Sequence, residues 1–160
     1  MKFLSIIAAC SILSLQAVFA QGPVLPDSTQ TYCPPLNMEL FLAGNFAELR
    51  NNHFHAGLDF KTQGVVDHPV YSFADGYVCR VGINARGYGL VVYVRHPQLG
   101  LTSVYAHLND FSEYIYNKVR EKQTKLEANN IQVAFEPDEL PVKKGDVIAK
   151  SGNTGSSGGP

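Results

Sequence analysis

Two short stretches of this chain combine residue types that bind metal ions and move protons. The first is His53-Phe54-His55-Ala56-Gly57-Leu58-Asp59-Phe60, where an imidazole and a carboxylate stand four residues apart. In a β-strand successive side chains point to opposite faces, so His55, Gly57 and Asp59 would share one face. Imidazole nitrogen and carboxylate oxygen are both zinc ligands, although a catalytic zinc usually has three from the protein. The spacing by itself also fits an ordinary pair of polar residues at the end of a strand.

The second stretch is Ser103-Val104-Tyr105-Ala106-His107-Leu108, where His107 ends a β-type run and could emerge at a cleft. The alternative for His107 is a hydrogen-bonded core histidine. His53 shares the predicted face of His55, and we favour a structural role for it. His68 and His96 each precede a proline in an expected turn, which predicts surface residues and not ligands.

The elements that must position these side chains are short β-type runs separated by glycine-containing turns. Their β-branched and aromatic content predicts antiparallel strands joined by tight turns at Asp75-Gly76, Arg86-Gly87 and Leu99-Gly100. The predicted strands are Met38–Leu42, Phe54–Phe60, Val70–Phe73, Tyr77–Val81, Leu90–Arg95, Thr102–His107, Ile131–Phe135 and Val147–Lys150.

One segment has a different period. Apolar residues fall near helical spacing over residues 111–129, with Lys, Glu and Gln on the other face, which predicts an amphipathic helix inserted between strands. We expect this insertion to be a surface feature without a catalytic role. The chain has 160 residues and a formal net charge of −1, which suits one domain and gives no reason to expect a nucleic-acid partner.

The N-terminus predicts export. Lys2 precedes an apolar run that ends in Val18-Phe19-Ala20, which is typical of a signal peptide over residues 1–20. Serines and Gln16 interrupt the run, which argues against a stable membrane span; lipid modification at Cys10 is a weaker alternative. A proline-rich extended segment would follow over residues 21–35. The mature chain would then contain Cys33 and Cys79, which could pair in an oxidising compartment or stay as buried thiols.

Taken in order, these segments resemble the lysostaphin-type (LytM-like) zinc metalloendopeptidases, a family of murein hydrolases. The resemblance covers residues 36–160 and joins distant stretches of the chain. Its motifs are His55-Ala56-Gly57-Leu58-Asp59, the segment Pro69–Val78, the run Gly89–His96, Tyr105-Ala106-His107-Leu108, Val142–Ile148 and Gly152–Pro160.

The resemblance implies an all-β fold with an antiparallel two-sheet, barrel-like domain and the helical insertion on one side. It implies that His55 and Asp59 are zinc ligands and that His107 is the active-site histidine, which assists the metal-bound water or steadies the transition state. The implied substrate is the peptide of bacterial peptidoglycan, hydrolysed in the periplasm, cell envelope or extracellular space. Zinc would polarise the scissile carbonyl and activate water while histidines move protons.

The chain departs from the family pattern at its end. Family members follow the glycine-rich segment with a His-x-His pair, whereas this sequence stops at Pro160. We therefore expect a fragment that lacks the last catalytic motif, binds zinc poorly and has little hydrolytic activity. The alternative function is a non-catalytic LytM-like domain that binds the cell wall or activates another hydrolase. A third hypothesis, a lipoyl- or biotinyl-type carrier domain, is suggested by Val142–Ile148 alone.

Overall fold

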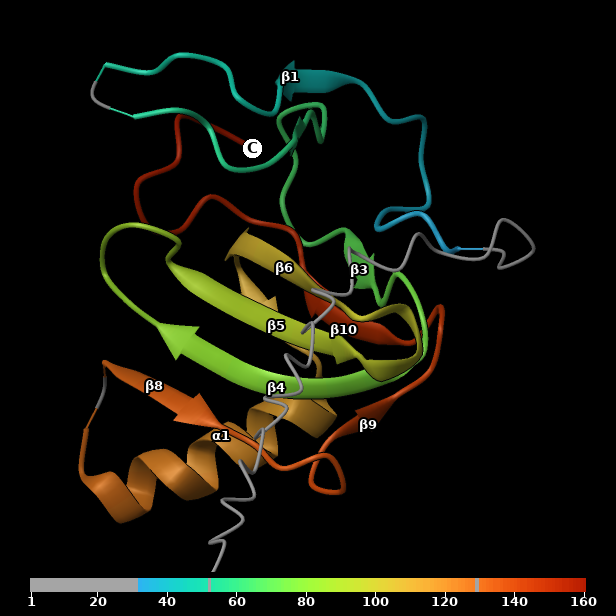
Figure 1. The fold of residues 1–160 in the computed structure, drawn as a ribbon. Helices are drawn as coiled ribbons and strands as arrows, with labels where there is room; N and C mark the ends of the chain where they lie inside the picture. The colour runs from blue at the N-terminus through green and yellow to red at the C-terminus, as the bar shows by residue number, and fades with distance from the viewer. Residues whose placement is uncertain (1–31, 52, 129) are drawn as a thin grey trace, which may run out of the picture.

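The computed structural model describes residues 32–51, 53–128 and 130–160. Within these residues the chain forms three antiparallel sheets and one α-helix, and none of the sheets closes on itself (Figure 1). The predicted all-β fold with one helical insertion is confirmed. The signal peptide predicted over residues 1–20 and most of the segment 21–35 lie outside the described residues and stay predictions.

The largest sheet has five strands. Its order is β6-β5-β4-β8, with β9 paired along β4. Four valines of β4 and β5 are fully buried, as expected for β-branched residues on the inner face of a sheet: Val78, Val81, Val92 and Val94. The strands are β4 (Gly76–Ile83), β5 (Leu90–His96), β6 (Leu101–Leu108), β8 (Ile131–Ala134) and β9 (Pro141–Val142).

Two smaller sheets complete the β-structure. One has the order β3-β10-β7, and the other pairs β1 with β2. Side chains from the five-stranded sheet, the three-stranded sheet and the helix meet in one hydrophobic core, which includes Val78, Val92, Phe111, Ile115 and Ile148. The strands of the smaller sheets are β1 (Leu42–Gly44), β2 (Asp59–Phe60), β3 (Pro69–Tyr71), β7 (Asp110–Phe111) and β10 (Val147–Lys150).

The predicted helical insertion is present as α1 (Glu113–Leu126), which lies beside β8 in Figure 1. It is shorter than the predicted 111–129 because Phe111 pairs with Ala149 in the three-stranded sheet, and Glu127 ends the helix in a left-handed conformation. Ile115 and Val119 form its buried face. Within the described residues, no helix is both long and apolar enough to cross a membrane.

Two of the three predicted turns join neighbouring strands. Arg86-Gly87 lies between β4 and β5, and Leu99-Gly100 lies between β5 and β6, where residues 97–99 form a 3-10 turn, η1 (Pro97–Leu99). The prediction for Asp75-Gly76 is wrong, since β3 and β4 belong to different sheets. At Gly76 the chain passes so close to the Arg95 carbonyl oxygen that a Cβ atom would clash with it.

The strand predicted over Phe54–Phe60 is also wrong for most of its length. Only Asp59–Phe60 forms a strand, β2, while Phe54 makes one isolated bridge to Leu49. A run of alternating residues becomes a strand only when a partner ladder and a buried face are available. Here Phe54 and Leu58 are 68% and 51% exposed, so this face has no core to cover it. The strand predicted over Met38–Leu42 is also displaced, because the observed strand β1 covers Leu42–Gly44.

Candidate active site

His55 and Asp59 face each other although no continuous strand joins them. The His55 Nε2 atom lies 3.1 Å from Asp59 Oδ1. A loop holds the histidine, because the backbone N–H of His55 donates to the Glu48 carbonyl and its own carbonyl accepts from the Ala47 N–H. Asp59 begins β2, which pairs with β1. The predicted juxtaposition of the two groups is therefore present, but a loop and a short hairpin produce it.

A hydrogen bond on the other side of the His55 imidazole indicates which ring nitrogen carries a hydrogen. Its Nδ1 atom lies 3.0 Å from the Asn45 carbonyl oxygen. A carbonyl can only accept, so Nδ1 must carry a proton, and in the neutral ring Nε2 presents a lone pair toward Asp59. Two electron-pair donors then face each other, and a cation between them, either a proton or a metal ion, makes the arrangement favourable.

This pair fits a zinc ion. Two ligands held at about 2.0 Å from one tetrahedral zinc lie roughly 3.3 Å apart, close to the separation of Nε2 and Oδ1. Imidazole nitrogen and carboxylate oxygen are also a donor set that zinc accepts. Within residues 32–51, 53–128 and 130–160, no three His, Cys, Asp or Glu side chains come together as one metal-binding group. Within the described residues, the His55–Asp59 pair therefore has no third potential ligand beside it.

Arg50 was not identified from the sequence and contacts the same carboxylate. Its Nη2 atom donates to Asp59 Oδ2 over 3.1 Å and lies 3.6 Å from Glu48 Oε2. The guanidinium therefore occupies one oxygen of Asp59 while the other oxygen faces His55. Gly44 makes room for this contact, because a Cβ atom there would collide with the Arg50 guanidinium. No spacing signal in the sequence links Arg50 with Asp59.

His107 stands in a β-bulge between β5 and β6. Leu90 pairs with Leu108 and Val92 pairs with Tyr105, so three steps along β6 oppose two along β5. His107 takes φ +57° in this bulge, a left-handed conformation that is uncommon outside glycine. Bulges often redirect a side chain next to a functional site. His107 lies near the end of a strand, as predicted. The bulge, however, takes its side chain out of the regular alternation along that strand.

The comparisons with known proteins bear on this arrangement. Residues 53–126 match peptidase family M23. A protein of Haemophilus influenzae described as an uncharacterized metalloprotease is 38% identical over 107 residues, which cover 66% of this chain. Residues 53–126 of this chain are therefore similar to peptidase family M23. The predicted resemblance to the lysostaphin-type peptidases is thus confirmed, and the matched segment is a metallopeptidase-family domain.

The chain spans only 17% of the length of the Haemophilus metalloprotease. No solved structure matches the chain. The matched M23 segment contains all three predicted site residues, His55, Asp59 and His107.

Two of the remaining histidines differ from expectation. His96 was predicted at the surface but is fully buried at the end of β5. His68 was also predicted at the surface, yet its Nε2 atom is buried and has no hydrogen-bond partner. The prolines after them fix the local backbone only, whereas packing against distant strands determines burial. His53 is exposed, and its carbonyl accepts a hydrogen bond from the Arg50 N–H. Cys33 and Cys79 are both free thiols.

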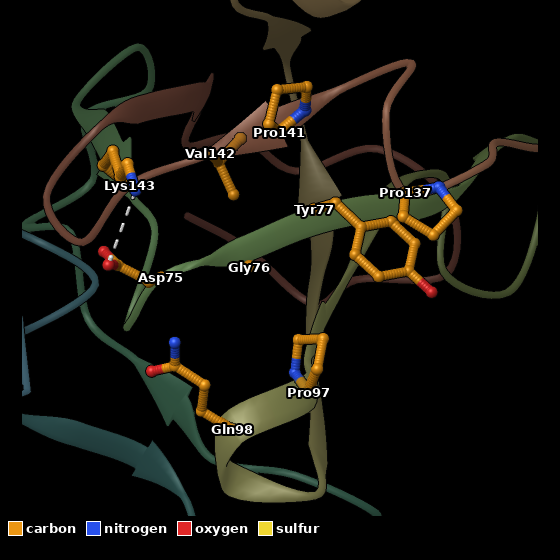
Figure 2. A pocket seen from close by; sticks show the side chains of 9 residues that line it. All are labelled: Asp75, Gly76, Tyr77, Pro97, Gln98, Pro137, Pro141, Val142 and Lys143. Atoms are coloured by element: carbon orange, nitrogen blue, oxygen red, sulfur yellow. Dashed lines mark ion pairs between the residues drawn. The ribbon is translucent and has the colours of Figure 1, made fainter.

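A pocket of about 390 Å³ opens on a different set of residues (Figure 2). Prolines and the Tyr77 ring line it, and Lys143 lies 3.8 Å from Asp75 at one end. None of the three predicted site residues contributes to its wall, so we assign it no part in the M23 reaction. The lining residues are Asp75, Gly76, Tyr77, Pro97, Gln98, Pro137, Pro141, Val142 and Lys143.

The left-handed backbone conformation of His107 leads to a prediction about the stability of two variants. Both His107→Gly and His107→Ala remove the ring, so their difference reports the backbone alone. We expect the glycine variant to be more stable than the alanine variant by about 1 kcal/mol, because only glycine adopts this conformation without strain. Urea denaturation of the two variants measures this difference. Equal midpoints with equal slopes would show that the bulge imposes no strain.

Proposed function

We propose that this chain is part of an exported zinc-dependent endopeptidase that hydrolyses peptide bonds of bacterial peptidoglycan. The observation that carries the proposal is the 3.1 Å approach of the His55 Nε2 atom to the Asp59 carboxylate. Such a pair is suited to a divalent cation, and the similarity of residues 53–126 to peptidase family M23 supports peptide hydrolysis as its use. Export rests on the signal-like N-terminus alone.

In the proposed reaction each residue has a separate task. His55 and Asp59 would hold zinc, which supplies a polarised carbonyl and an activated water when it is bound. Arg50 keeps Asp59 in place by binding its second carboxylate oxygen. His107 would exchange a proton with the peptide or the attacking water through Nε2, since Nδ1 donates to the Thr154 carbonyl.

The alternative, a non-catalytic domain that binds the cell wall, predicts no metal-dependent cleavage. A digestion assay with purified peptidoglycan separates the two functions. We expect the 160-residue chain with added zinc to release peptide fragments slowly, because the described residues supply fewer ligands than a catalytic zinc usually has.

Three substitutions serve as controls for this assay. His55→Ala, Asp59→Asn and His107→Ala should each remove the zinc-dependent release. Release that is unchanged by chelation of the metal, or by all three substitutions, would contradict the proposal. Binding of peptidoglycan without any release would favour the non-catalytic alternative.

A further inference from the structure

Thr154 connects the ring of His107 with the ends of two strands. The Thr154 carbonyl oxygen lies 2.9 Å from His107 Nδ1. The hydroxyl of the same residue donates to the Leu108 carbonyl over 2.6 Å and accepts from the Leu90 N–H over 3.0 Å. Leu90 and Leu108 are opposite each other in the β5–β6 ladder, beside the bulge. One threonine side chain therefore bridges the two strands beside the bulge that contains His107.

The carbonyl contact determines the tautomer of His107. Because a carbonyl can only accept, Nδ1 carries the proton, and Nε2 of the neutral ring has a free lone pair. The edge of the ring lies against Tyr88, with the two ring centroids 6.4 Å apart. No other described residue forms a hydrogen bond to Nε2. The ring is thus held from one side and presents a basic nitrogen on the other.

The close approach of the Thr154 segment depends on two glycines. A Cβ atom at Gly89 would collide with the Thr154 hydroxyl, and a Cβ atom at Gly155 would collide with the Gly87 carbonyl. Gly89 and Gly155 also have φ +63° and +75°, conformations that favour glycine. The backbone here is therefore shaped so that Thr154 can reach both strands.

We propose that Thr154 is a positioning residue that sets the tautomer and orientation of His107. The Thr154 hydroxyl fixes the position of the Thr154 carbonyl, which accepts a hydrogen bond from the Nδ1–H group of His107. The Nε2 atom of the neutral ring therefore stays unprotonated and can accept a proton. This inference rests on the proposed function only in that Nε2 would act on the peptide or on water. The placement of the ring itself does not depend on turnover.

Nitrogen-15 NMR of the histidine rings tests the proposal directly, because the two ring nitrogens have different chemical shifts in the two tautomers. The His107 signals are assigned by their loss in His107→Ala. In the wild-type chain at a pH where the ring is neutral, we expect the Nδ1–H form. Thr154→Val has nearly the same shape but lacks both hydroxyl bonds, so the population should shift toward the Nε2–H form. Thr154→Ser keeps the hydroxyl and should restore the wild-type pattern.

A matched control comes from the same segment. The Ser156 hydroxyl accepts from the Gly87 N–H but contacts neither Leu90, Leu108 nor His107, so Ser156→Ala should leave the His107 signals unchanged. An Nε2–H pattern in the wild-type chain would overturn the proposal, and this result does not depend on any substitution of Thr154. An unshifted pattern in folded Thr154→Val would overturn it as well.

The digestion assay provides a second readout. Thr154→Val should lower kcat about 10- to 100-fold with little change in KM, as misplacement of a catalytic group does. An unchanged kcat would contradict the positioning role. The ring measurement needs no turnover, so failure of the peptidase proposal and failure of this inference give different results.

Discussion

Replacement of Asp59 by Asn is expected to lower the affinity of this chain for zinc by about 100-fold or more. Substitutions of groups that only orient a ligand commonly lower metal affinity 10- to 100-fold, and Asp59 would be a ligand itself. The neutral amide also no longer offsets the positive charges of the ion and of Arg50, whose guanidinium lies 3.1 Å from the carboxylate. Isothermal titration calorimetry with zinc measures the change.

The control for this experiment is a carboxylate of the same type elsewhere. Asp138 is exposed in the connection between β8 and β9, and Asp138→Asn should leave zinc affinity within about 3-fold of wild type. His55→Ala should cause a loss like that of Asp59→Asn, and the double variant should be little worse than either single variant because the pair binds as a unit. Equal zinc affinity for wild type and Asp59→Asn would rule out this pair as the metal site.

The second large effect concerns the stability of the fold. His96→Ala is expected to reduce the free energy of unfolding by about 3 kcal/mol, the combined effect of a cavity and of lost hydrogen bonds. The ring is fully buried, with Nδ1 2.9 Å from the Asp75 carbonyl oxygen and Nε2 2.8 Å from the Ser103 hydroxyl. Removing it takes a hydrogen bond from the Asp75 carbonyl and one of the two hydrogen bonds from the Ser103 hydroxyl. Urea denaturation measures the loss.

The hydrogen-bonded chain continues beyond the ring. The Ser103 hydroxyl lies 3.1 Å from that of Tyr105, which accepts a hydrogen bond from the Phe73 N–H over 2.8 Å. Burial raises the pKa of Tyr105, so this phenol stays protonated at neutral pH. His96→Gln retains one donor and one acceptor and should recover part of the lost stability. If His96→Ala unfolds at the same urea concentration as the wild type, the ring does not contribute to stability in this way.

Much of the fold could be predicted from the sequence. Strands β4, β5, β6, β8 and β10 lie within two residues of their predicted positions. Their sequences are rich in residues that favour β-structure, and turns that contain glycine separate several of them. The helical period over residues 111–129 likewise predicted α1. In these segments the local pattern and the tertiary packing favour the same structure, so local reasoning is sufficient.

The candidate site could be predicted only in part. The motif around His55 and Asp59 was recognisable because its residues are close in sequence and its ligand types are characteristic. The residues that hold the candidate site side chains in place could not be recognised from the sequence. Arg50 reaches Asp59 through the fold of the intervening loop, and the Thr154 carbonyl contacts a ring that is 47 positions away in the chain.

The sequence by itself determined the fold class, the helical insertion and the types of the groups that could bind metal, because each depends on residue type and short-range spacing. The tertiary structure alone decided which side chains meet and which are buried. His96 is internal because distant strands enclose it, and residues 54–58 are not a strand because no ladder or core lies beside them. His107 leaves the regular alternation because the β5–β6 register shifts between Leu90 and Val92, which places an extra residue of β6 in a bulge. These outcomes arise from contacts between segments far apart in the chain, which local periodicity cannot specify.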